Sequence, residues 1–98
     1  MAKHYYIMDD SHNVIETDYD TWRRWNSNPD NRKVAFTKIT DRIGVNTVFL
    51  MGGSDPSTMF QAMIVGGTLG NSSWRYSTWD DAVAGHAVAV QKATDAQG

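Results

Sequence analysis

The chain has no cysteine among its 98 residues. Disulfide-bonded frameworks, zinc ribbons and thiol nucleophiles are therefore excluded, and in so small a domain the absence of disulfides favours the cytoplasm. No apolar run approaches the roughly 18 residues of a membrane span. The N-terminal sequence MAKHY lacks the apolar stretch of a signal peptide. We therefore expect a cytoplasmic protein with no membrane partner.

Charge of one sign is also scarce, since nine basic and eleven acidic residues give a net charge of −2. A general nucleic-acid binder needs a basic face, so that class is not expected, although a local basic site remains compatible with the composition. Glutamate occurs once, at Glu16, and most aspartates fall in turns and helix caps, which argues against paired catalytic carboxylates. These absences predict a binding protein without catalytic residues.

Known catalytic and phosphate-binding motifs are missing as well. The chain has no Gly-x-Ser-x-Gly nucleophile elbow. The Gly66–Ser73 segment lacks the Gly-Lys-Ser/Thr ending of a phosphate-binding loop, so we interpret it as a connection between strands. Asp9, Asp10 and His12 offer three metal ligands within one turn, but turn chemistry explains them better. We expect no metal and no cofactor.

What is present is a good supply of aromatic residues: four Trp, four Tyr and three Phe. The first part of the chain predicts two short strands that form a hairpin, over residues 4–8 and 14–17. A helix capped by Asp18 should follow and end by Asn28, because Pro29 disfavours helical geometry in the residue before it. Tyr19, Trp22 and Trp25 recur every three residues and should share one helix face.

The second part predicts strands over residues 32–39, 42–51, 59–65 and 74–76, then a final helix capped by Ser77. Its predicted apolar face consists of Trp79, Val83, Ala87 and Val90. A neighbouring stripe of Ala82, Gly85 and Ala89 would let another element approach closely. We therefore predict one α+β domain spanning residues 1–98, with a frayed tail at about 95–98. Its architecture should be a curved antiparallel sheet of about four to six strands, with two helices packed on one side.

Several blocks resemble a family of small uncharacterised proteins of bacteriophages and prophages. They include Thr47–Leu50, Gly66–Gly67, the sequence RYSTWDD at 75–81 and Ala84–His86. The resemblance covers most of residues 18–86 and implies a protein that acts in a bacterial host cell. The chain departs from the family pattern by lacking a histidine in the 52–55 loop and by carrying Gln61 in place of a glutamate.

Five residues are candidate ligand contacts. Arg75, Tyr76 and His86 would bind a phosphate or carboxylate if they converge beside the N-terminus of the last helix. The alternative places His86 as a half-buried, hydrogen-bonded side chain, Arg75 in an ion pair with Asp80 or Asp81, and Tyr76 in the core. Trp25 could stack on a planar base while Arg24 meets its phosphates, or Trp25 belongs to the core.

We therefore predict a non-enzymatic phage accessory protein that sequesters a small anionic ligand, such as a nucleotide signal of host defence. One alternative is an inhibitor that binds a host defence protein, of the anti-CRISPR type. Another is a small nucleotide-acting enzyme that uses His86 as acid and base. Because a small domain has little core, we also expect a homo-oligomer.

Overall fold

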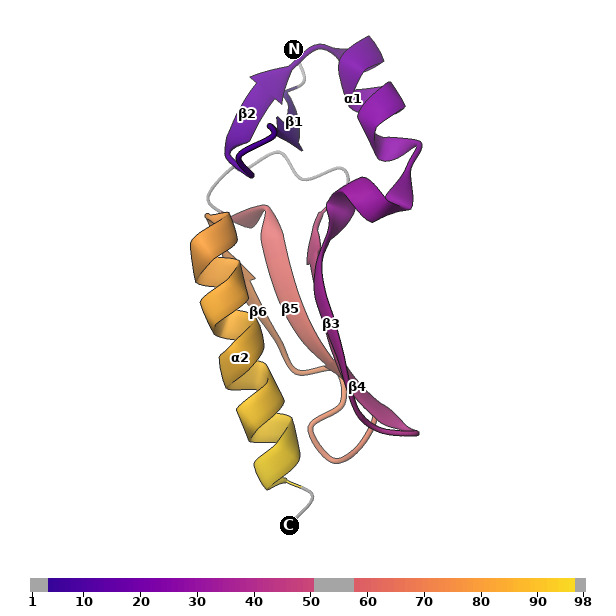
Figure 1. Ribbon diagram of the computed structural model, residues 1–98, viewed down its shortest axis with the longest axis vertical. Coiled ribbons are helices and arrows are strands. Elements are labelled where there is room, and N and C mark those ends of the chain that lie inside the picture. Colours follow the sequence, from indigo (N-terminus) through magenta and orange to yellow (C-terminus); the bar gives the residue numbers. More distant parts are fainter. Residues whose placement is uncertain (1–3, 51–57, 97–98) are drawn as a thin grey trace.

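The computed structural model describes residues 4–50 and 58–96, and the predicted loop at 52–57 and the end of the predicted tail lie outside them. Six strands, two α-helices and one 3-10 helix follow one another along the chain (Figure 1). Their order is β1 Tyr5–Met8, β2 Val14–Thr17, α1 Tyr19–Asn26, η1 Pro29–Arg32, β3 Lys33–Thr40, β4 Ile43–Phe49, β5 Phe60–Val65, β6 Ser73–Tyr76 and α2 Trp79–Asp95. The predicted α+β class with antiparallel sheets is confirmed.

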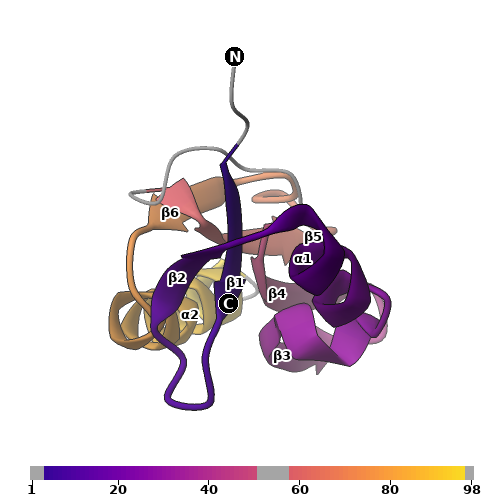
Figure 2. The same cartoon turned by 90° about the horizontal axis from the view of Figure 1, so that it is seen from above.

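The strands are divided between two sheets. The hairpin β1–β2 forms one sheet, and the other has the order β3-β4-β5-β6 with every pair antiparallel. The separation follows from the chain between them, because α1 and η1 interrupt the path from β2 to β3. Helix α2 packs on the four-stranded sheet, whereas α1 packs beside β1. Viewed along the long axis, α1 and α2 lie on opposite sides of the hairpin (Figure 2).

The hairpin and α1 are held by local hydrogen bonds. The Asp9 carboxylate accepts hydrogen bonds from the backbone N–H groups of Asn13 and Ser11. These bonds, that of Asn13 above all, lower the pKa of Asp9 below its ordinary value. Asp18 caps α1 as predicted, since its side chain accepts from the Thr21 N–H at 2.7 Å. After the end of α1, the residues Pro29–Arg32 form the short 3-10 helix η1, with Pro29 in its first turn.

Aromatic contacts attach the hairpin to the rest of the molecule. The His12 ring stacks on Trp79 at the start of α2, with ring centroids 3.7 Å apart and nearly parallel planes. Trp25 of α1 meets Phe49 of β4 edge to face, with centroids 5.3 Å apart. Met8 joins the same core cluster as Phe49 and Phe60. Apolar packing therefore continues from the hairpin into the four-stranded sheet.

The buried face of α2 differs from the predicted one. Its buried residues are Ala82, Gly85, His86, Ala89 and Ala93, which include the whole stripe predicted to allow close approach. The predicted apolar face was partly wrong: Trp79 and Val90 pack against the core, but Val83 and Ala87 face solvent. The cause lies in the sheet, which presents bulky aromatic side chains to the helix: a methyl group added at Gly85 would overlap the Tyr76 ring. Thr78 rather than Ser77 caps α2, accepting from the Asp81 N–H.

Candidate ligand-binding site

His86 is a buried, fully hydrogen-bonded side chain. Only 7% of its surface is exposed. Its Nε2 lies 2.8 Å from Thr37 Oγ1 and its Nδ1 lies 2.7 Å from Thr47 Oγ1. Burial lowers the pKa of His86 below the ordinary histidine value, which favours the neutral ring. Both ring nitrogens are therefore engaged between the helix and the sheet, and neither points to a surface where a ligand would bind.

Arg75 and Tyr76 lie on opposite faces of the sheet. They are successive residues of β6, and successive side chains of a strand point to opposite faces. Tyr76 packs beneath α2 against Gly85 and belongs to the core periphery. Arg75 is exposed on the other face, where its guanidinium donates to the Thr58 carbonyl oxygen at 3.4 Å. The predicted convergence of Arg75, Tyr76 and His86 is therefore not formed.

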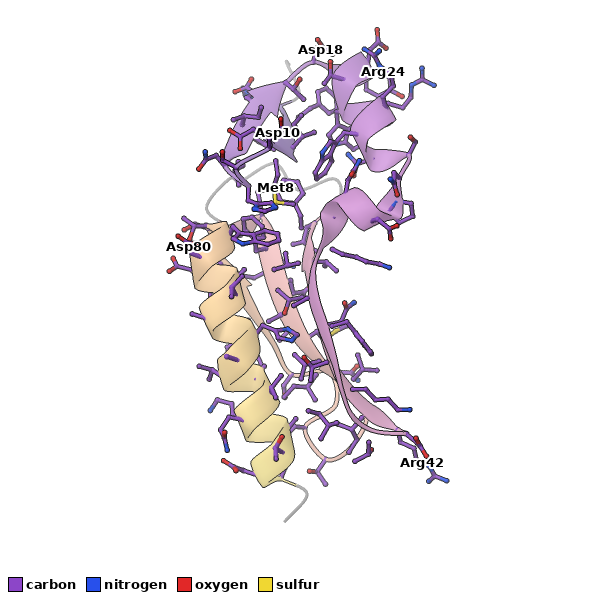
Figure 3. All side chains as sticks on the ribbon, in the orientation of Figure 1. Met8, Asp10, Asp18, Arg24, Arg42 and Asp80 are labelled. Carbon is purple, nitrogen blue, oxygen red and sulfur yellow. The ribbon has the colours of Figure 1, made fainter. Side chains whose placement is uncertain are left out.

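Trp25 and Arg24 are also separate from that group. Trp25 is partly buried and packs on the aromatic core through an edge-to-face contact with Phe49. Arg24 is exposed, and its Nε donates to the Asp20 carbonyl oxygen. Figure 3 places Arg24 near one end of a molecule that is 48 Å long and Arg42 near the other. The five predicted residues thus form no common exposed site: Tyr76, His86 and Trp25 pack toward the core, while Arg75 and Arg24 are exposed on different elements.

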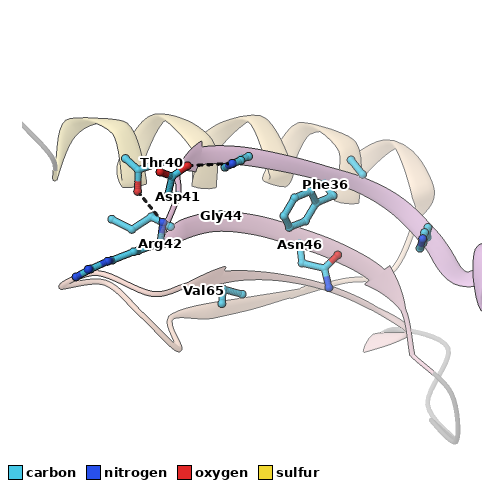
Figure 4. Close-up of a pocket in the computed structure, with 11 residues that line it drawn as sticks. Phe36, Thr40, Asp41, Arg42, Gly44, Asn46 and Val65 are labelled. Atoms are coloured by element: carbon cyan, nitrogen blue, oxygen red, sulfur yellow. Dashed lines mark hydrogen bonds and ion pairs between the residues drawn. The ribbon is translucent and has the colours of Figure 1, made fainter.

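A different surface gathers binding groups: the face of the four-stranded sheet that α2 does not cover. Here an open depression of about 660 Å³ lies over β3, β4 and the end of β5 (Figure 4). We name its central part the sheet platform, defined by Phe36, Lys38, Arg42, Gly44, Asn46 and Val65. Arg75 lies on the same face of the sheet, because the strand pairings align it with Gln61, Val48 and Lys33.

An exposed aromatic ring lies beside Gly44 on the sheet platform. Phe36 is 66% exposed, the highest fraction among the large apolar side chains that are exposed in the described residues. Gly44 of β4 makes room for it, since a methyl group there would come within 3.1 Å of Phe36 Cζ. The ring therefore lies close to the β4 backbone at Gly44, while most of its surface stays exposed. An open aromatic face is what a planar ligand ring requires for stacking.

Cationic and amide groups line the same depression at increasing distance from this ring, and Arg42 lies at its far end, at the β3–β4 turn (Figure 4). Lys33 pairs with Asp30 and Lys38 pairs with Asp41, each at 3.1 Å and well exposed, so an anionic ligand can compete for both lysines. Among the described residues, the Arg42 guanidinium and the Asn46 amide make no side-chain hydrogen bond. Asn46 lies directly across from Phe36 in the β3–β4 pairing. Its amide offers both donors and an acceptor to the edge of a stacked ring.

One sequence signal for this surface was missed. Phe36, Lys38 and Thr40 alternate along β3 and are all exposed. On the solvent-facing side of a strand the alternating side chains are usually polar, so an aromatic residue at such a position is unusual. That mismatch singles out Phe36 without any structure.

A smaller hollow of about 290 Å³ separates the hairpin from the sheet and includes Asp9, Asp10, His12 and Trp79 in its lining. Within residues 4–50 and 58–96, no group of three or more His, Cys, Asp or Glu side chains is arranged to hold a metal ion. Asp9 is engaged by the turn backbone and His12 by Trp79. The interpretation of this segment as a hairpin turn agrees with these contacts.

Neither helix of the described chain is long and apolar enough to cross a membrane. Comparisons of the chain with protein-family models, with curated proteins and with solved structures gave no match.

Proposed function

We propose that this protein binds and sequesters a small anionic ligand with a planar ring, of the nucleotide class, on the sheet platform. The observation that carries the proposal is the exposed Phe36 ring, which lies close to the β4 backbone at Gly44. Stacking supplies affinity for any nucleobase. Asn46 lies across from Phe36 and would meet the base edge, while Lys38 and Arg42, further along the same depression, would meet phosphates.

Sequestration rather than turnover fits the groups present. The sheet platform contains no histidine, serine or glutamate, so it lacks the side chains that most often act as general base or nucleophile. His86, the residue of the enzymatic alternative, is buried on the other face of the sheet. In the setting that the sequence resemblance implies, the ligand would be a nucleotide signal of host defence, withdrawn from the host cytoplasm.

The test is a calorimetric titration with ADP-ribose, cyclic ADP-ribose and cyclic dinucleotides. We expect at least one to bind, with affinity falling as salt is raised. Phe36→Ala should weaken binding roughly five- to a hundredfold, since base stacking contributes about 1–3 kcal/mol. Arg42→Ala should weaken it too, whereas Arg24→Ala, the matched change at the far end of the molecule, should not.

Recovery of the ligand distinguishes binding from catalysis. After prolonged incubation with the protein, chromatography should return the bound nucleotide unchanged. If none of these nucleotides binds, or if Arg24→Ala weakens binding as much as Phe36→Ala does, the assignment to the sheet platform is wrong. Conversion of the ligand would favour the enzymatic alternative.

A further inference from the structure

The outer side of α2 is an apolar surface that no described element covers. The nine residues 82–90 read AVAGHAVAV, and the polar side chain among them, His86, is buried against the sheet. The solvent side of this stretch therefore carries alanines and valines, with Val83 at 45% and Val88 at 54% exposed. A helix that is apolar around its whole circumference is normally buried on all sides. This surface lies along the outer flank of the molecule, away from the sheet (Figure 1).

Charges at the two ends of this stretch indicate what covers it. Asp80 and Asp81 lie in the first turn of α2 and Lys92 in its last. None of the three takes part in an ion pair within the described residues. Asp81 and Lys92 are 11 residues apart, close to three full turns, so they share one side of the helix with Ala84 and Val88. The apolar stretch and the opposite charges are centred on the same turn, near His86.

We infer that α2 is the interface of a homodimer, in which the helix pairs antiparallel with α2 of a second copy. A two-fold axis at the level of His86 places Asp81 of each copy opposite Lys92 of the other. The dimer would therefore contain two equivalent Asp81–Lys92 ion pairs. Ala84 at the centre permits a short distance between the helix axes. A different partner protein would have to reproduce this symmetric order of charges, which a second copy supplies by construction.

This arrangement is compatible with the sheet platform. Helix α2 covers one face of the four-stranded sheet and the platform lies on the other. Each copy of the dimer would therefore hold its platform outward. A contact made by one helix face is smaller than the roughly 800 Å² per partner of a standard interface, so we expect micromolar dissociation.

Sedimentation equilibrium of the full chain, from low micromolar to near-millimolar concentration, tests the inference. The wild type should pass from a monomer of 11.0 kDa to a dimer. Val88→Asp should remain monomeric throughout. Val65→Asp is the matched control, because Val65 is 46% exposed but lies on the sheet platform, and this variant should dimerise like the wild type. Circular dichroism checks that both variants are folded.

Charge reversal tests the antiparallel pairing itself. Asp81→Lys and Lys92→Asp should each weaken the dimer roughly two- to thirtyfold, and the double variant should recover wild-type dimerisation. A wild type that stays monomeric overturns the inference. So does a dimer that survives Val88→Asp but is lost in Val65→Asp, since the interface would then be the open sheet face. Failure of the double variant to recover overturns the antiparallel register.

Discussion

The two faces of the four-stranded sheet differ in how far their apolar side chains are buried. On the face covered by α2, Val45, Phe49, Phe60 and Ile64 are at most 1% exposed, and the polar His86 is satisfied by two threonine hydroxyls. On the open face, a phenylalanine and a valine lie in solvent among lysines and arginines. Apolar burial and hydrogen bonding account for these side chains of the first face. The second keeps apolar area exposed that folding does not need, which is the usual mark of a binding surface.

The same substitution on the two faces should give the sharpest contrast. Phe60→Ala removes a fully buried ring and should lower the free energy of unfolding by about 3–5 kcal/mol. Phe36→Ala removes a ring that is mostly in water and should change it by no more than about 0.5 kcal/mol. Urea denaturation of both variants measures the difference. Equal losses would mean that the Phe36 ring is part of the core.

The next largest loss of stability is expected from a substitution in the contact between α2 and the covered face of the sheet. Gly85→Ala adds a methyl group where the Tyr76 ring lies, so helix or ring must shift. We expect a loss of about 1–3 kcal/mol, as for other overpacked sites, although alanine favours helix more than glycine does. Thermal unfolding measures it, with Ala87→Gly on the solvent side of α2 as a comparison for helix propensity. A more stable Gly85→Ala variant would contradict the close packing.

The smallest expected effect concerns pH. Burial lowers the pKa of folded His86, so the unfolded chain binds more protons as the pH falls below the ordinary histidine value. Above the ordinary histidine pKa, the neutral His86 ring makes its full contribution to the free energy of unfolding. This contribution is lost as the pH falls toward the lowered pKa of the folded state. The urea midpoint of the wild type should therefore fall between pH 7.5 and pH 5. His86→Gln should show a shallower fall. Identical slopes would mean that the folded state accommodates the protonated ring.

Local chemistry made much of the fold predictable. The Asp18 cap, the stop before Pro29 and the strand segments were all readable from residue types, and the strand bounds differ from the predictions by one or two residues. The buried side of α2 could not be predicted from residue types, because alanine and valine occur on every side of that helix. What decides its buried side is the size of Tyr76 and its neighbours on the sheet, which is a tertiary fact.

The candidate site was less predictable for a related reason. Arg75, Tyr76 and His86 are close in sequence, but strand alternation sends Arg75 to the opposite face from Tyr76. Phe36 and Asn46 are brought together only by the pairing of β3 with β4, and the room for the Phe36 ring depends on Gly44. Proximity in sequence therefore suggested that Arg75 and Tyr76 act together, but the sheet places them on opposite faces. The sheet platform consists instead of residues that are not predicted as ligand contacts from the sequence.

The most direct test of the account is to map ligand binding on the two faces of the sheet by NMR. Isotope-labelled protein would be titrated with ADP-ribose and with a cyclic dinucleotide while backbone amide shifts are followed. The account predicts that shifts concentrate at Phe36, Lys38, Gly44, Asn46 and Val65, and that they are absent from the Phe36→Ala variant. Shifts confined to Tyr76, His86 and the buried side of α2, or no shifts with either ligand, would contradict it.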